Sequence, residues 1–303
     1  MTKEEKIERI LQLKKERNAV ILAHYYVADD LQAIADYTGD SFYLSQMAAR
    51  SDADVIVFCG VRFMGESAKI LSPQKTVYLP CLTADCPMAH MASASEIARL
   101  REELPDLAVV CYINSDVELK ALSDVCVTSS NALKIVKSLP QENIYFIPDA
   151  NLGRFIEAKC PDKFFYYSDG FCCVHAHLRA DDVENAKRAH PGCPVLVHPE
   201  CRAEVTSRAD YVGSTKGMIE YAASIPDREI IVGTECGILF ELRRRCPDKV
   251  FHLLKDDMVC RDMKKLTLDG LLDALEGRLA PVEIPEETAE KAAGCLRRML
   301  ELG

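Results

Sequence analysis

Cys160-Pro161-Asp162-Lys163 occurs again as Cys246-Pro247-Asp248-Lys249, a shift of 86 residues, and this repetition decides the fold. The same shift maps, without a gap, Tyr112 onto His198, Asn114 onto Glu200, Ser129 onto Thr215 and Asp149 onto Glu235. A fainter first copy begins with the run AVILAHYY ending at residue 26, which resembles AVVCYINS ending at 115 and PVLVHPEC ending at 201. The chain is therefore predicted to contain three copies of one unit.

One cysteine keeps the same phase in all three copies. These cysteines are Cys86, Cys172 and Cys260, separated by 86 and 88 residues, and no other cysteine recurs in every copy. Each lies in a turn-like stretch, TADCPMAHM, SDGFCCVHAH or DMVCRDMKKLTL. Because equivalent loops of packed repeats face one another, we expect the three thiols to surround one shared pocket.

Each copy alternates short β-branched runs with helical segments, which indicates parallel strands, right-handed crossovers and helices on both faces of a sheet. Strands are expected at 107–112, 124–127, 143–147 and 163–167 in the second copy, and at 194–197, 210–212, 229–232 and 249–253 in the third. We predict an α/β protein with three pseudo-threefold-related αβα sandwich domains, arranged as a triangle around a central site. The expected domains are 1–88, 89–175 and 176–261, with 262–303 packing back on the first.

Composition narrows the class of protein. A chain of 303 residues suggests about two domains by length alone, but no Pro-rich or Gly/Ser-rich linker separates the copies, so three tightly packed units are expected. The net charge of −10 disfavours nucleic acid as a partner, because phosphate binding needs clustered Lys and Arg. The N-terminal segment MTKEEKIERILQLKKERN lacks an apolar signal core, and no apolar run approaches the roughly 20 residues that span a bilayer. A cytoplasmic protein without membrane contact is expected.

Most of the 14 cysteines are predicted to be structural. In a reducing compartment they are not expected to form a disulfide framework. Cys59, Cys111 and Cys126 lie in or at the ends of strand-like runs, where a free cysteine acts as a small buried hydrophobe. Cys160 and Cys246 precede prolines at expected helix ends and have no counterpart near Gln74, so they are interpreted as structural.

Polar side chains follow the first strand of each copy, at the edge of an open α/β sheet where ligands bind. They are His24 and Tyr26, Tyr112 and Asn114, and His198 and Glu200. Two further pairs, Ser129 with Ser130 and Ser214 with Thr215, open expected helices whose unpaired N–H groups suit a carboxylate or a phosphate. An ordinary helix N-cap is the alternative for each pair.

Three cysteines from three units can form a zinc site with an open position or an iron–sulfur cluster with one iron that lacks a protein ligand. Zinc sites usually use closely spaced cysteines or mix Cys with His, and neither pattern occurs at these three positions. We therefore favour the cluster, with three merely buried thiols as the remaining alternative. Cys173 competes with its neighbour Cys172 for the second position, and His175 is expected to point back into the pocket.

An open iron position polarises a bound oxygen, which suits dehydration chemistry. Elimination of water also needs proton donors and acceptors, and Glu200, His198, Tyr26 and His24 supply them on adjacent strand ends. A structural hydrogen bond is the alternative for each histidine. The remaining histidines apart from His175 lack this placement and are interpreted as structural; they are His90, His177, His190 and His252.

With these residues in view, the chain resembles the quinolinate synthase family, the iron–sulfur enzymes of bacterial NAD biosynthesis. The resemblance covers nearly the whole length. It is carried by AHYY at 23–26, GDS at 39–41, GVRFMGE at 60–66, CPMAHM at 86–91, YINS at 112–115, VTSSNA at 127–132, GFCCVH at 170–175, VHPE at 197–200, VGST at 212–215 and CRDMKK at 260–265. Any one of these motifs alone would be weak, but together they are highly specific.

The resemblance implies a [4Fe–4S] cluster on the pseudo-threefold axis with three ligands, which carry over onto Cys86, Cys172 and Cys260. It implies condensation of iminoaspartate with dihydroxyacetone phosphate to quinolinate, phosphate and water, and functional coupling to an aspartate oxidase or dehydrogenase. Glu200 would shuttle protons and Tyr26 would assist ring closure. The residues implied to hold substrate carboxylates and phosphate are His24, Ser41, Tyr112, Asn114, Ser129, His198, Ser214 and Thr215, with His175 near the cluster.

The chain departs from the family pattern in one loop. Some members carry a C-x-x-C-x-x-C stretch around the third ligand, whereas only Cys260 is present here, so no redox-active thiol pair is expected from that motif. Two other functions stay open at this stage. One is a different [4Fe–4S] hydro-lyase acting on a small hydroxy acid, and the other is a non-catalytic iron–sulfur or zinc carrier.

Overall fold

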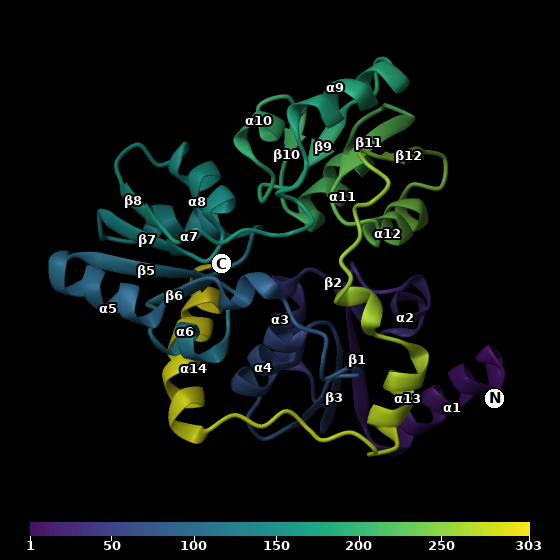
Figure 1. The fold of residues 1–303 in the computed structure, drawn as a ribbon. Helices are drawn as coiled ribbons and strands as arrows, with labels where there is room; N and C mark the ends of the chain where they lie inside the picture. The colour runs from purple at the N-terminus through teal and green to yellow at the C-terminus, as the bar shows by residue number, and fades with distance from the viewer.

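The computed structural model describes residues 1–303 and contains three four-stranded parallel sheets (Figure 1). Each sheet has the same strand order, with the first strand of the unit between the second and third and the fourth at the edge. The first sheet contains β1 (Ala19–His24), β2 (Tyr37–Gly39), β3 (Val55–Cys59) and β4 (Thr76–Tyr78); the second contains β5 (Leu107–Tyr112), β6 (Val125–Val127), β7 (Asn143–Ile147) and β8 (Phe164–Tyr167); the third contains β9 (Val195–Val197), β10 (Tyr211–Val212), β11 (Glu229–Gly233) and β12 (Val250–Leu253). The predicted α/β class with three αβα sandwich domains is confirmed.

Helices connect the parallel strands, as crossovers require. In chain order they are α1 (Lys3–Glu16), α2 (Asp29–Ile34), α3 (Ser41–Arg50), α4 (Arg62–Leu71), α5 (Ala94–Glu103), α6 (Val117–Ala121), α7 (Ala132–Ser138), α8 (Ala150–Glu157), α9 (Ala180–Ala189), α10 (Ala203–Thr206), α11 (Thr215–Ser224), α12 (Ile238–Arg245), α13 (Leu268–Leu275) and α14 (Glu286–Leu302). None of them is long and apolar enough to cross a membrane.

The repeated Cys-Pro-Asp-Lys stretch has the same structural role in two domains. The Lys163 ammonium donates to two backbone carbonyls just beyond α7, and the Lys249 ammonium donates to two carbonyls at the end of α11. Lys75 makes the equivalent contacts at the end of α3. The first copy therefore keeps the proline and the lysine of this stretch, while Ser72 stands where the other copies have Cys160 and Cys246, so these two cysteines have no counterpart there. Lysine at these positions satisfies carbonyls that a helix C-terminus leaves without a partner.

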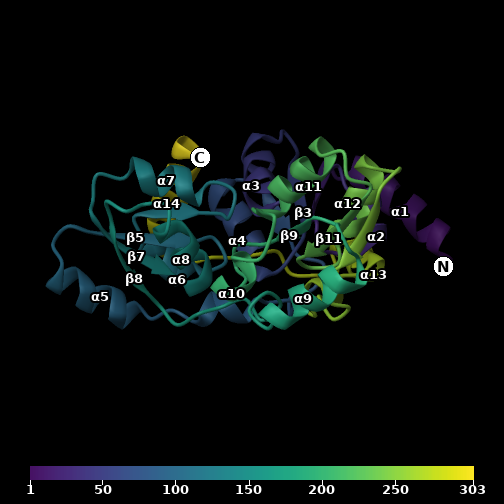
Figure 2. The ribbon, with the colours of Figure 1, turned by 90° about the horizontal axis from the view of Figure 1, so that it is seen from above.

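The hydrophobic core is divided unevenly among the three sheets. The first and second sheets share one continuous core with α13 and α14, whereas the third sheet has a separate cluster on each of its faces. Helix α13 packs on α1, and α14 lies against both α4 and α6. The result is a flattened triangle, with the third domain joined to the other two around a partly polar centre (Figures 1 and 2). The exact domain boundaries stay a prediction.

Candidate active site

A cavity lies where loops from all three domains converge beyond the carboxyl ends of their strands. Of the residues singled out from the sequence, those lining it are His24, Tyr26, Ser41, Cys86, Tyr112, Asn114, Ser129, Cys172, its neighbour Cys173, His175, His198, Glu200, Thr215 and Cys260. Ser130 and Ser214 do not line it, and Ser214 instead caps α11, where its hydroxyl accepts the backbone N–H of Gly217. The repeat thus brings chemically different side chains from three domains to one place.

The strand-end pairs are held by the same local contact in the first and third domains. The backbone N–H of Tyr26 donates to Nδ1 of His24 at 3.2 Å, and that of Glu200 donates to Nδ1 of His198 at 3.3 Å. Burial, helped by the nearby His198, lowers the pKa of His24 to about 3. His24 is therefore neutral, and because its Nδ1 is an acceptor, its hydrogen lies on Nε2.

Glu200 is buried between two imidazoles. Its Oε2 lies 2.7 Å from Nδ1 of His175 and 3.2 Å from Nδ1 of His198, whose rings stack with centroids 4.6 Å apart. Burial alone would raise the pKa of Glu200, but the two histidines outweigh it and hold the pKa well below its usual value. The other oxygen, Oε1, is buried without a hydrogen-bond partner. Glu200 is therefore an ionised carboxylate with one free acceptor atom.

A chain of hydrogen bonds links Tyr26 to Glu200. The Tyr26 hydroxyl lies 2.7 Å from Thr215 Oγ1 and 2.8 Å from Thr234 Oγ1, and Thr234 Oγ1 lies 2.8 Å from Nε2 of His175. Since the Nδ1–H of His175 donates to Glu200, its Nε2 must accept from Thr234 when the ring is neutral. Burial, the largest cause, raises the pKa of Tyr26 well above its usual value. Tyr26 therefore stays protonated at the far end of this chain.

The three in-phase cysteines share a contact that the sequence did not reveal. The backbone N–H of each cysteine donates to a carboxylate. The pairs, with their N···O distances, are Cys86 with Asp85 at 2.8 Å, Cys172 with Asp149 at 3.1 Å and Cys260 with Glu235 at 3.1 Å. Asp149 and Glu235 are fully buried at equivalent positions of two repeats. Each cysteine loop is thus anchored by a carboxylate.

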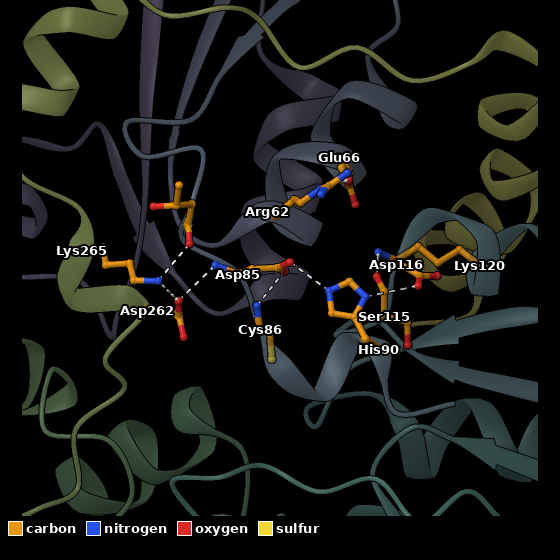
Figure 3. A network of polar contacts seen from close by, with 11 residues as sticks. Arg62, Glu66, Asp85, Cys86, His90, Ser115, Asp116, Lys120, Asp262 and Lys265 are labelled. Carbon is orange, nitrogen blue, oxygen red and sulfur yellow. Dashed lines mark hydrogen bonds and ion pairs between the residues drawn. The ribbon is translucent and has the colours of Figure 1, made fainter. Parts of the chain in front are cut away.

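The first cysteine loop is also tied to the second domain and to the stretch that directly follows Cys260 (Figure 3). Oδ2 of Asp85 lies 2.9 Å from Nε2 of His90, and Nδ1 of His90 lies 3.6 Å from Asp116, the N-cap of α6 in the second domain. On its other side the N–H of Asp85 donates to Asp262 at 3.3 Å, two residues beyond Cys260. Lys265 donates to the same Asp262 oxygen at 2.6 Å. These contacts fix the Cys86 loop relative to the Cys260 loop.

Several site residues were missed by the sequence reasoning. Thr234 has no polar counterpart, because the register places Pro148 at the same position of the second domain. Asp40 belongs to the GDS motif and caps α3, and its second oxygen is buried without a partner. Asp149 and Glu235 were aligned by the repeat, but a hydrogen bond to a backbone group 23 or 25 residues away leaves no local pattern.

Comparisons with known proteins give one consistent result. The family model described as "Quinolinate synthetase A protein" matches residues 8–301. A protein of Caldicellulosiruptor bescii named quinolinate synthase is 50% identical over 97% of this chain and 97% of its own length. The protein of the same name from Caldicellulosiruptor saccharolyticus is 50% identical over 98% of this chain and 99% of its own length. The one from Thermodesulfovibrio yellowstonii is 46% identical over 98% of this chain and 98% of its own length. The chain belongs to the quinolinate synthetase A family, the enzymes that form quinolinate for NAD biosynthesis.

Proposed function

We propose that the chain condenses iminoaspartate with dihydroxyacetone phosphate to give quinolinate, phosphate and two waters. In this proposal Cys86, Cys172 and Cys260 hold a [4Fe–4S] cluster with one iron open to substrate. The family resemblance implies an iron–sulfur cofactor, and Cys172 lies with His175 and Glu200 in a group that could hold a metal ion. The observation that carries the proposal is that one cysteine from each domain lines the same cavity as Glu200 and Tyr26.

The spacing of the three thiols fits a cluster better than a single ion. With a Zn–S bond of about 2.3 Å, tetrahedral zinc would need sulfur atoms about 3.8 Å apart. The sulfur atoms of Cys86, Cys172 and Cys260 do not all lie within 4.8 Å of one another. Burial raises the pKa of the Cys260 thiol to about 11. Because both zinc and iron–sulfur clusters bind thiolates, the spacing of the three sulfur atoms is what favours a cluster.

The anchoring carboxylates favour Cys172 over its neighbour. Cys172 donates its N–H to Asp149 as Cys260 does to Glu235, whereas Cys173 makes no such contact and is exposed. His175 Nδ1 lies 3.2 Å from the Cys172 sulfur, which places an imidazole beside the proposed ligand. When bound, the cluster would supply a Lewis-acid iron that polarises a substrate oxygen or nitrogen.

Proton transfer is assigned to Glu200 and Tyr26. Glu200 is ionised with Oε1 free, so it can accept a proton from a carbon next to a carbonyl and return it, as a keto/aldo isomerisation requires. Tyr26 is protonated and can donate to a departing hydroxyl during ring closure. The hydrogen-bond chain through Thr234 and His175 links the two groups. Glu200, His175 and Thr234 are buried and Tyr26 is partly buried, which restricts the access of bulk water to the exchange.

The remaining polar residues are proposed to bind the substrate. Asn114 Oδ1 is buried without a partner, which suggests that a substrate donor completes it. Thr215 begins α11, where free N–H groups suit the phosphate, and Ser214 fixes that helix start as its cap. We assign the substrate carboxylates to the other polar groups that line the cavity, namely His24, Ser41, Tyr112, Ser129 and His198.

Metal analysis with an activity assay tests this proposal. Anaerobically purified chain should contain about four irons and four acid-labile sulfides, the content of one cubane cluster. It should also form quinolinate from dihydroxyacetone phosphate and freshly generated iminoaspartate. Stoichiometric zinc without sulfide would reject the cluster, and a loaded cluster without quinolinate would reject the substrates. Because an imine of this kind hydrolyses in water, we further propose that an enzyme oxidising aspartate supplies it.

A further inference from the structure

A second group of metal-ligating side chains lies away from the active site. His190, Glu229 and His252 place one ligand atom each within 4.8 Å of the other two. His190 caps the C-terminus of α9, Glu229 is the first residue of β11, and His252 lies in β12. Because Glu229 begins its strand, the group lies toward the amino ends of the strands of the third sheet, whereas the catalytic cavity lies beyond their carboxyl ends. Three separate segments of the chain thus meet in one cluster.

The cluster is partly assembled but has an unused donor. Nε2 of His252 lies 3.0 Å from Oε2 of Glu229, and the His190 and His252 rings stack with centroids 3.6 Å apart and an interplanar angle of 20°. The His190 ring makes no hydrogen bond or ion pair, although polar groups surround it. Because the rings are nearly parallel, one must turn about its side-chain bonds before both nitrogens address a common point. The partly buried His190 ring can turn without breaking a hydrogen bond, at the cost of its stacking on His252.

The surroundings suit a cation. An open cavity of about 410 Å³ is lined by His190 and Glu229 together with Cys193, Asp227 and Arg228. Cys193 is close enough to Glu229 for that carboxylate to contribute, after burial, to a raised pKa of the thiol. The cavity therefore offers two carboxylates and a thiol beside the His190 imidazole, against one guanidinium, and His252 reaches Glu229 from outside this lining.

We propose that His190, Glu229 and His252 form a second metal site, selective for Zn²⁺ and similar borderline ions. Two imidazole nitrogens and one carboxylate are a known zinc donor set, whereas Mg²⁺ and Ca²⁺ prefer oxygen ligands alone. The fourth ligand is water or, after rotation of its side chain, Cys193. A bound ion would join the end of α9 to β11 and β12 and would stiffen the third domain, which has no share in the common core.

The same domain contains a matched control. Nε2 of His177 lies 3.1 Å from Asp257, which is a similar histidine–carboxylate pair, but no third donor joins it. Sequence reasoning interpreted His177, His190 and His252 alike as structural. The structure separates them, because only the last two converge with a second imidazole and a carboxylate.

Zinc binding to the cluster-loaded chain tests the proposal independently of catalysis. Anaerobic equilibrium dialysis against Zn²⁺, with zinc and iron measured together, should show one zinc per chain and no loss of iron. His252→Ala and Glu229→Gln should each weaken zinc binding at least about tenfold, as loss of a metal contact does. His177→Ala should leave it unchanged. Saturating zinc should also raise the melting temperature by a few degrees, roughly, in the wild type and in His177→Ala only.

The outcomes that overturn the proposal are distinct. No zinc bound at about 100 μM free Zn²⁺, or equal binding by the wild type and Glu229→Gln, would reject the site; the near-isosteric glutamine makes misfolding an inadequate explanation. Zinc bound only with loss of iron would place the ion at the cluster cysteines instead. Cys193→Ser decides the fourth ligand, since it weakens binding only if the thiol contributes.

Discussion

Asp149 in the second domain and Glu235 in the third occupy the same position of the repeat and have different electrostatic surroundings. Each accepts the backbone N–H of the cysteine that follows the next strand, at 3.1 Å in both domains. Glu235 has a cation beside it, because Lys264 lies 3.0 Å from its Oε1. Asp149 has no ion-pair partner, and burial, with the charge of Glu200, raises its pKa well above the usual value.

The comparison separates what the repeat determines from what each domain adds. The repeated backbone fixes where a carboxylate must accept an N–H, because parallel strands of equal register place the loops alike. The charge of that carboxylate is then balanced locally, by an ammonium in one domain and by a raised pKa in the other. Equivalent geometry therefore does not imply equivalent chemistry, and variants at matched positions can test how far the equivalence extends.

The largest effect is expected at the cysteines themselves. Cys172→Ser and Cys260→Ser should both reduce iron from about four per chain to near zero, because a serine hydroxyl does not replace a thiolate ligand. Cys173→Ser is the matched control and should keep its iron. Iron and sulfide analysis measures both. If Cys173→Ser loses its iron and Cys172→Ser retains it, Cys173 is the ligand. The equivalence between the Cys172 loop and the Cys260 loop would then be shifted by one residue.

The next largest effect is expected at Glu200, whose repeat partner is Asn114. Glu200→Gln should lower kcat by roughly 10²–10⁴-fold at unchanged iron content, because it removes the proton acceptor. Asn114→Ala should act mainly on KM, since an amide can only bind. Steady-state kinetics with iron analysis distinguishes the two. A loss of iron in Glu200→Gln would argue that this residue supports the cluster and is not catalytic.

The two anchoring carboxylates should differ in their contribution to stability. Glu235→Gln leaves the Lys264 ammonium without its anion and removes one acceptor, so a cost of about 2–3 kcal/mol is expected. Asp149→Asn resembles the protonated acid that its raised pKa favours, and about 1 kcal/mol is expected. Urea unfolding of the two variants under identical anaerobic conditions measures the difference. Equal costs would mean that Lys264 does not stabilise Glu235.

A smaller effect is expected at Thr234, which the second domain replaces with Pro148. Thr234→Val keeps the shape and removes the hydroxyl between Tyr26 and His175, so kcat should fall roughly tenfold, or about 1.4 kcal/mol. Thr234→Ser restores the hydroxyl and should recover most of the activity. If valine and serine behave alike at this position, the hydrogen-bond chain has no part in turnover.

The sequence predicted the strands of the second and third domains to within about one residue, because buried parallel strands form continuous apolar runs bounded by polar turns. It also predicted which strand-end residues would meet, since the carboxyl ends of parallel strands share one edge. The contacts that it missed are long-range. The Thr234 hydroxyl and the Asp149 carboxylate form hydrogen bonds with partners in other loops. The spacing of residues in the sequence does not indicate which partners these are.

The first copy shows how chemical equivalence can outlast sequence similarity. Ser72-Pro73-Gln74-Lys75 shares only two residues with the later tetrapeptides, yet the Lys75 ammonium bonds the end of α3 as its counterparts bond α7 and α11. Identity at two of four positions was too weak to detect without the sheets as a guide. The retained residues are those with a physical task, namely a proline after the helix and a lysine that caps carbonyls.

The smallest effects should therefore arise at the two lysines of the repeated Cys-Pro-Asp-Lys stretch. Lys163→Met and Lys249→Met retain the apolar stem and remove the charged donor from half-buried positions, so each should cost about 1 kcal/mol of unfolding free energy. Because the two sites lie in different sheets, the double variant should lose the sum of both within about 0.5 kcal/mol. Urea unfolding of the three variants measures this. A marked departure from the sum would mean that the two sites are energetically coupled, whereas additivity would show that the two copies of the motif act independently of each other.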